Sequence, residues 1–244
     1  MRAGWVLYKA QSRAANRRRV LGWLWLFLPT VVISVLALSM HKAGIIDVKV
    51  PADDYPAFVL TGLIAWYIFT DALMAPLNAL RRHQGMICRN PLPHETIMVA
   101  ALLSLMTDAL ARTVVLLAAL WLLTDIAAPV GIAAILGLLV PLAVGFAFGI
   151  WIAPHCLVHD DLADMLPFGL MLLLFLSPVF YPLGQLFFAR TSPIGPAIEA
   201  YRSLALGQPL QSGAVAWFLG SFVIGYLGWL SYRRGKADMI ARLG

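Results

Sequence analysis

The sequence predicts an all-α integral membrane protein that crosses the bilayer six times, and three observations predict this fold class. Apolar residues make up 61% of the chain and charged residues only 12%, whereas soluble domains are about half apolar and about a quarter charged. The chain has six apolar runs, and the first four reach the ~20 residues that a ~30 Å hydrocarbon core requires. Lys and Arg lie in short clusters beside these runs, as the positive-inside rule predicts. The net charge of +6 therefore reflects membrane topology, and we expect no nucleic-acid partner.

Residues 1–244 are expected to form a single transmembrane domain, and its first segment, residues 1–19, is basic and amphipathic. Lys and Arg alternate there with apolar side chains such as Trp5 and Tyr8, a pattern typical of a helix lying on the membrane surface. A secretory signal peptide is the alternative. The apolar run at 20–40 is longer than the ~7–15 residues of a signal-peptide core and no clear cleavage site follows it, so we assign it as the first span.

The other spans follow in order, separated by polar segments. A polar loop at 41–56 precedes the second span, and polar segments at 81–95 and 155–165 precede the third and the fifth. The predicted second to sixth spans are residues 57–80, 97–124, 130–153, 166–181 and 213–232. Spans one to five thus occupy residues 20–181, and a basic tail, residues 233–244, follows span six.

The apolar pattern is broken at residues 182–212, and the prolines of the sequence LSPVFYP already interrupt it at the end of span five. Arg190, Glu199 and Arg202 add charge to the same region. Irregular backbone is costly in lipid because its amide and carbonyl groups find no partner there. We therefore expect this segment to lie where protein or water satisfies its backbone.

The basic residues also orient the chain. The N-terminal segment, the 81–95 loop and the C-terminal tail together carry thirteen Lys and Arg residues, whereas the segments on the opposite side carry four. Cytoplasmic loops are the ones enriched in Lys and Arg, so both termini are expected in the cytoplasm and the broken segment at the exterior. Cys88 and Cys156 then fall in cytoplasmic segments, where no disulfide is expected.

Several motifs occur in a particular order along the chain: RRRVLGWLW, LTGLIAWYIF, RNPLPHE, HDD, LSPVFYP and SPIGPAIEAYRSLALG. In this order and spacing they resemble the membrane subunits of ABC-2-type exporters, in particular those that export O-antigen and other polysaccharides. The resemblance covers nearly the whole chain. One departure is Ser192-Pro193-Ile194, where the family commonly has Asn-Pro-Leu.

The resemblance implies a half-transporter in the bacterial inner membrane that pairs with a second copy of itself and with two cytoplasmic ATPase subunits. ATP and Mg²⁺ would bind to those ATPase subunits, and no cofactor is expected on this chain. The pair Gly235-Lys236 lacks the upstream glycine and the following Ser or Thr of a phosphate-binding loop. We therefore expect a transport subunit and not an enzyme.

Two spans would line a channel for a lipid-linked polysaccharide, such as the O-antigen of lipopolysaccharide. By the same resemblance, residues 182–212 would form two short re-entrant helices at the outer mouth of that channel. The alternative cargo for this architecture is another amphiphile, such as a teichoic-acid-like polymer, a glycolipid or a drug.

Force from the ATPase would reach this subunit through the N-terminal helix and the 81–95 loop. That loop is short and polar, and two prolines stiffen it. The residues expected to couple to the ATPase are Arg81, Arg82, Arg89, Pro91 and Glu95. A solvated connector with no such contact is the alternative interpretation.

Three ionisable residues fall inside predicted spans, where a charge is costly unless it is paired or faces water. Asp71 lies in span two, and Asp108 and Arg112 in span three. At ~1.5 Å per residue they lie about 14, 17 and 22 Å from the cytoplasmic surface. Asp108 and Arg112 are also neighbours on one helix face. All three are expected to form an ion-pair cluster, with direct substrate binding as the alternative.

The run HCLVHDD before span five has the residue types of a metal or catalytic site, and an intramembrane enzyme is the rival class of function. His155 and His159 share one helical face, but Cys156 and Asp160 share the adjacent face. Adjacent faces do not converge on one tetrahedral point. We therefore expect no metal here, and carboxylates at the start of a helix instead.

Aromatic residues are the expected contacts for a sugar polymer, because a flat apolar ring face with few strong hydrogen bonds lets a polymer slide. The candidates are Trp66, Tyr67, Phe175, Phe180 and Tyr181. Interfacial belts or simple packing are the alternatives.

In the outer re-entrant segment we expect Glu199 and Arg202 to pair, and Tyr201 is a further candidate contact. The Gly145-to-Gly149 spacing is typical of close helix packing, either within one chain or between two copies.

Overall fold

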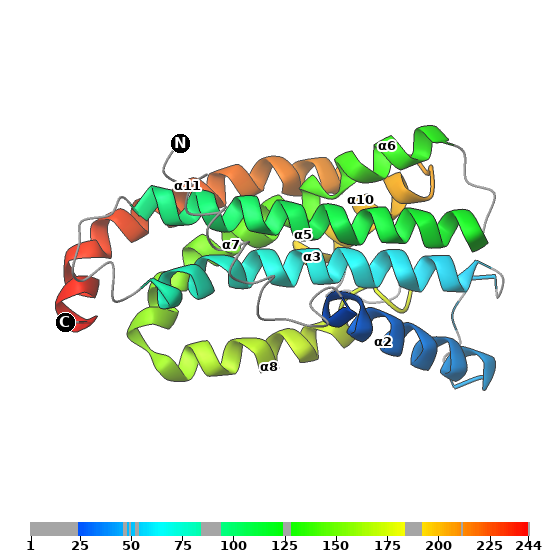
Figure 1. The fold of residues 1–244 in the computed structure, drawn as a ribbon, viewed down its shortest axis with the longest axis horizontal. Coiled ribbons are helices and arrows are strands. Elements are labelled where there is room, and N and C mark those ends of the chain that lie inside the picture. The colour runs from blue at the N-terminus through cyan, green and yellow to red at the C-terminus, as the bar shows by residue number, and fades with distance from the viewer. Residues whose placement is uncertain are drawn as a thin grey trace.

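The computed structural model describes residues 24–45, 48, 50–51, 54–83, 94–123, 128–183, 192–210 and 212–243. In this part of the chain the regular structure is helical, and the helices run along the long axis of the molecule (Figure 1). Their bounds are α2 Leu24–Lys42, α3 Tyr55–Arg82, α5 His94–Leu123, α6 Ala128–Gly137, α7 Leu139–Val158, α8 Asp160–Leu176, α10 Ile194–Ala205 and α11 Ser212–Leu243.

Three of the described helical segments are long and apolar enough to cross a membrane, namely Tyr55–Arg82, Thr96–Trp121 and Gly131–Val158. Shorter apolar helices lie at Phe27–Lys42 and Val215–Ser231. Every one of these segments falls on a predicted span. The helical, membrane-compatible character of the chain is therefore confirmed, while the count of six spans stays a prediction.

Helix α3 is the centre of the fold and packs against α2, α5, α7 and α10. Its most apolar stretch is 72% buried, compared with 33% for that of α5. Helix α8 packs mainly against α7 and leaves large apolar side chains such as Phe168 and Met171 exposed. In Figure 1 α8 and α2 lie on the same side of α3. Their outward faces are apolar, as expected for surfaces that meet lipid or another protein chain.

Two glycines let α3 and α7 approach closely. A Cβ atom at Gly145 would collide with the carbonyl oxygen of Phe69, and one at Gly149 would collide with that of Leu73. The small-residue pattern of α7 therefore serves packing within this chain. These two glycines therefore pack against α3 of the same chain, and they do not form the alternative, a contact between two copies.

The predicted polar loop at 155–165 is wrong. Helix α7 continues through Pro154 to Val158, and α8 begins at Asp160. His159 alone breaks the helix, with an extended backbone at φ −125° and ψ 102°. Asp160 and Asp161 occupy the first turn of α8, as expected for carboxylates at the positive end of a helix dipole.

Helix α8, which covers most of the predicted fifth span, ends at Leu176, before the predicted bound of residue 181, because of the proline at position 178. Ser177 is extended, at φ −88° and ψ 154°, since the helical region is disfavoured for a residue before proline. Its hydroxyl donates to the carbonyl oxygen of Leu174 over 2.7 Å. The chain then makes a compact irregular turn through Tyr181.

Beyond this turn the structure describes one short helix, α10, between residues 182 and 212. A second re-entrant helix would fall at 184–191, outside the described residues. Helix α10 ends at Ala205. Gly207 follows with a φ of 70°, which suits glycine after a helix end, and the amide of Gln208 donates to the carbonyl of Ser203 over 2.6 Å. Helix α11 covers the predicted sixth span and continues through the basic tail to Leu243.

Candidate functional site

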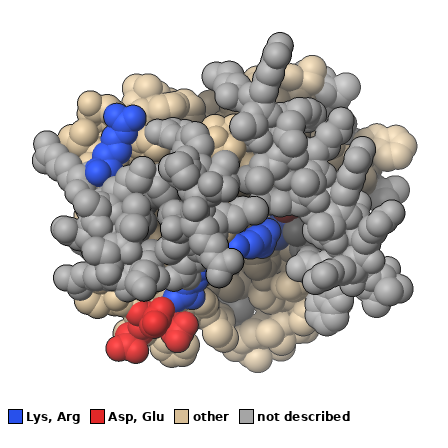
Figure 2. Space-filling model, turned by 60° about the vertical axis from the view of Figure 1, so that its left-hand side comes forward, with Lys and Arg blue, Asp and Glu red and all other residues tan. Residues whose placement is uncertain are grey.

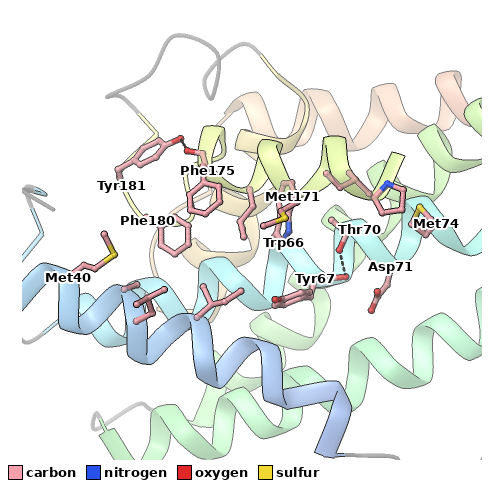
Figure 3. Close-up of a pocket in the computed structure, with 16 residues that line it drawn as sticks. Met40, Trp66, Tyr67, Thr70, Asp71, Met74, Met171, Phe175, Phe180 and Tyr181 are labelled. Carbon is pink, nitrogen blue, oxygen red and sulfur yellow. Dashed lines mark hydrogen bonds between the residues drawn. The ribbon is translucent and has the colours of Figure 1, made fainter. Parts of the chain in front are cut away.

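A groove of about 840 Å³ lies between α2, α3 and α8 and the turn that follows α8. Helix α2 contributes aliphatic side chains such as Leu36, and α3 contributes residues from Trp66 to Met74. The wall opposite is built from α8 and the turn. In Figure 3 Met40 and Tyr181 lie at one end of the groove, and Asp71 and Met74 lie at the other.

The five aromatic residues singled out in the sequence all line this groove. They are Trp66, Tyr67, Phe175, Phe180 and Tyr181. The structure thus brings together residues of two distant segments of the chain on one apolar surface. Whether they contact a substrate stays a prediction.

The aromatic wall at the end of α8 is held by contacts among its own members. The rings of Phe175 and Phe180 are stacked with centroids 6.0 Å apart. The hydroxyl of Tyr181 donates to the carbonyl oxygen of Phe175 over 2.8 Å, a bond drawn in Figure 3. The turn is therefore folded back against α8, with its rings beside the last helical turn.

An ion pair lies at the Asp71 end of the groove. Arg112 Nη2 donates to Asp71 Oδ2 over 2.7 Å, and the guanidinium carbon lies 5.2 Å from the centre of the Tyr67 ring. The Arg112 side chain is only 7% exposed and that of Asp71 45%. A charge this deep is tolerated because it is paired.

Asp108 and Arg112 line a second, more polar pocket of about 380 Å³ between α3 and α5. Asn78 and Arg82 also line it, and Asp71 borders both pockets. The three charges predicted to cluster are thus brought to one region. Nε and Nη1 of Arg112 have no hydrogen-bond partner among the described residues.

Arg202 of α10 is the most completely enclosed charge of the described chain, at 1% exposure. Nη1 donates to Glu199 over 2.7 Å, as the sequence spacing predicts. Nη2 donates to the carbonyl oxygens of Pro178 and Val179 over 2.7 and 3.3 Å. The guanidinium carbon of Arg202 also lies 3.6 Å from the centre of the Phe58 ring.

Tyr201 does not reach the groove. Its side chain is 0% exposed, and its hydroxyl shares a hydrogen bond of 3.0 Å with that of Thr113 on α5. The structure therefore gives Tyr201 a packing position between α10 and α5.

The candidate coupling residues are only partly described. Arg81 Nη2 lies 3.3 Å from Asp160 Oδ1 at the start of α8. In Figure 2, which turns this side of the molecule forward, basic and acidic side chains lie next to each other. Arg89 and Pro91 lie outside the described residues, and Glu95 is described only as part of the α5 backbone. Coupling to an ATPase stays a prediction.

The side chains of the HCLVHDD run do not converge. Cys156 is 1% exposed and packs with Leu77 and Leu80, whereas His155 and His159 are exposed. The imidazoles and the thiol therefore belong to opposite sides of the helix end. This arrangement gives no support to the rival interpretation of a catalytic centre.

Sequence reasoning missed the contribution of α2 and the methionines. Leu36 and Met40 line the groove, but α2 is apolar on all sides and so carries no periodic signal for one face. It also missed Gly62, which lies against Arg202 and Val179. A glycine inside an apolar span was the available signal for a close approach.

The relatives found by comparison with known proteins are polysaccharide transport proteins. No protein-family model matches the chain. Two polysialic acid transport proteins named KpsM, both from Escherichia coli, are each 22% identical to it over 250 residues. Each alignment covers 96% of this chain and 93% of the relative. A similarity that runs the whole length of both proteins supports, at the level of the family, the resemblance to membrane subunits of ABC-2-type polysaccharide exporters.

Proposed function

We propose that this chain is the permease subunit of an ATP-driven exporter that moves a lipid-linked, O-antigen-like polysaccharide across the bacterial inner membrane. The observation that carries the proposal is the aromatic groove between α2, α3 and α8. The full-length similarity to polysialic acid transport proteins supports a polysaccharide as the cargo.

The groove has the surface that a sliding sugar polymer needs. Trp66, Phe175 and Phe180 offer ring faces, which pack on the apolar faces of pyranose rings without strong directional bonds. Methionines such as Met171 supply soft, adaptable walls. Weak contacts repeated along a path let a polymer pass through without lodging.

One copy of the chain builds only one side of such a path. The groove is lined by α2 and α8, and both helices also carry exposed apolar residues, Val35 at 63%, Phe168 at 63% and Met171 at 62% exposure among them. Part of these surfaces is expected to meet lipid. A second copy that brings its own α2 and α8 to the same place would close the groove into a channel.

In this proposal the chain crosses the membrane six times with both termini in the cytoplasm, and α10 lies at the outer face. Separate cytoplasmic subunits bind and hydrolyse ATP with Mg²⁺. The basic clusters of the sequence support this orientation. A different amphiphile would use the same groove and is the alternative cargo.

The proposal is tested by purifying the tagged chain from its host in mild detergent and identifying what accompanies it. We expect a second copy of the chain and an ATPase subunit whose activity rises in the presence of this chain. In the host, deletion of the chain should leave polysaccharide in the cytoplasm, visible by glycan staining of fractionated cells. Surface polysaccharide that is unchanged in the deletion strain would contradict the proposal.

A further inference from the structure

We infer that Arg202 is the positioning residue of the aromatic groove: it holds the turn after α8 so that Phe180 and Tyr181 face the groove. The inference rests on the proposed function for its consequence in transport. The contacts that carry it are those of the turn itself.

The turn exposes carbonyl groups that no helix satisfies. Residues Pro178 to Tyr181 lie between the end of α8 and the segment leading to α10. The amide of Val179 donates to the carbonyl of Ser177 over 2.8 Å, which closes a tight bend. The carbonyl groups of Pro178 and Val179 then need donors from elsewhere, since irregular backbone beside lipid is costly when unpaired.

Arg202 of α10 supplies those donors from the side of the turn that faces away from the groove. One nitrogen, Nη2, reaches the carbonyl oxygens of both Pro178 and Val179. The next carbonyl, that of Phe180, accepts a longer contact of 3.5 Å from the buried hydroxyl of Tyr55. Three successive carbonyls are therefore drawn toward the α3 and α10 side of the turn.

The direction of these carbonyl groups also sets the direction of the side chains in the turn. Val179 is fully buried on the same side, while Phe180 and Tyr181 line the groove. Figure 3 places both rings beside Phe175 on the groove side. Without the guanidinium, the two carbonyls lose their common donor, and the turn is free to rotate toward water or lipid and carry the rings with it.

The rest of the site fits a guanidinium in this position and no smaller cation. Glu199 takes Nη1 over 2.7 Å and balances the buried charge, while Phe58 covers the planar face at 3.6 Å. A planar, forked donor can serve a carboxylate and two carbonyls at once. A lysine ammonium carries its three donors on one nitrogen and lacks the planar fork that serves Glu199 with one nitrogen and the two carbonyls with another.

Gly62 provides the space in which the contact forms. A Cβ atom there would lie 2.5 Å from Arg202 Nη2 and 3.1 Å from the carbonyl oxygen of Val179. Because the second of these is backbone, it cannot move aside as a flexible side chain would. Gly62 is therefore required for α3 to lie under the bond between Arg202 and the turn.

The test measures the position of the turn directly. In a chain with Cys88→Ser and Cys156→Ala, a Tyr181→Cys reporter is labelled with a water-soluble maleimide in membrane vesicles. We expect Arg202→Gln to change the labelling rate by about tenfold or more, the order expected when bonds from a charged donor are lost. Arg202→Lys should give an intermediate rate. Unchanged labelling in correctly assembled Arg202→Gln protein would overturn the inference.

A second variant covers the case in which Arg202→Gln does not assemble. Gly62→Ala keeps the arginine and disturbs only its contact with the turn, so it should shift the labelling rate in the same direction. Gly220→Ala is the matched control, since a Cβ atom at Gly220 meets nothing within 4 Å. Equal labelling in the Gly62 and Gly220 variants would also overturn the inference.

The two proposals fail in different ways. Labelling in vesicles requires neither cargo nor an ATPase, so it reports the turn even if the cargo is not a polysaccharide. Export measured in the same variants, with Tyr181 restored, reports transport. If the proposed function is right, export falls in the variants whose labelling shifts and stays normal in Gly220→Ala.

Discussion

Arg112 of α5 donates a hydrogen bond of 2.7 Å to Asp71 of α3 at the point where the aromatic groove meets the polar pocket. The arginine is nearly enclosed and the aspartate is half exposed. Loss of the bond therefore affects the two partners differently. Removing Asp71 leaves the buried guanidinium of Arg112 without this bonded countercharge.

Asp71→Asn should destabilise the protein because it removes the countercharge of Arg112. Breaking a buried pair from one side costs about 3–5 kcal/mol, and the exposure of Asp71 places this case at or below about 3 kcal/mol. Thermal unfolding in detergent measures the loss. The double variant Asp71→Asn with Arg112→Gln should be more stable than Asp71→Asn alone. Simple addition of the two single effects would contradict the coupling.

Trp66→Ala and Phe175→Ala should distinguish the contribution of an aromatic ring to stability from its contribution to export. Trp66 is 3% exposed, so its removal leaves a cavity and costs about 3–5 kcal/mol of stability. Phe175 is 58% exposed, so its removal should cost only about 0.5–1.5 kcal/mol through the loss of its stacking on Phe180. Both should slow export if the groove is the path. Normal export by Phe175→Ala would remove that ring from the path.

Gly145→Ala should separate α3 from α7. The added Cβ would collide with the Phe69 carbonyl and lie 2.8 Å from the Cβ atom of Ala72. Overpacking of this kind costs about 1–3 kcal/mol, which a lower unfolding temperature would reveal. Gly169→Ala on α8 is the control, because no atom lies within 4 Å of its added Cβ, and the two variants should differ clearly.

Tyr201→Phe should lower stability by about 1 kcal/mol through loss of the bond to Thr113. Thr113→Val should cost a similar amount, because each variant removes the same bond and leaves one buried hydroxyl without its partner. Since Tyr201 does not line the groove, export per folded molecule should stay normal in Tyr201→Phe. Reduced export at normal protein levels would place Tyr201 in the path after all.

The sequence was sufficient for the positions of the apolar helices, because long apolar runs need no partner to be recognised. It also indicated the pairing of Glu199 with Arg202, since three residues on a helix are neighbours. The ends of α7 and α8 were placed incorrectly. Polar residues were taken as loop, whereas helical backbone continues through them wherever hydrogen bonding allows.

What escaped prediction is mostly contact between distant segments. The bond from Arg202 to Pro178 joins residues 24 positions apart, and no periodic pattern encodes such a contact. The burial of Tyr201 is of the same kind, because only the docking of α10 on α3, α6 and α7 decides which side of a short helix faces protein. Local rules describe each helix, and the groove is a property of their assembly.

In the proposed six-span topology, the shortness of α8 has a consequence for the lipid around it. Its 17 residues extend about 25 Å at ~1.5 Å per residue, and the first turn is acidic, so its apolar length falls well below a ~30 Å core. A bilayer adapts to a short helix by thinning beside it. The leaflets would thus come closest together next to the groove. Transport should therefore depend on acyl-chain length, and vesicles of thicker bilayers should show slower export than thin ones.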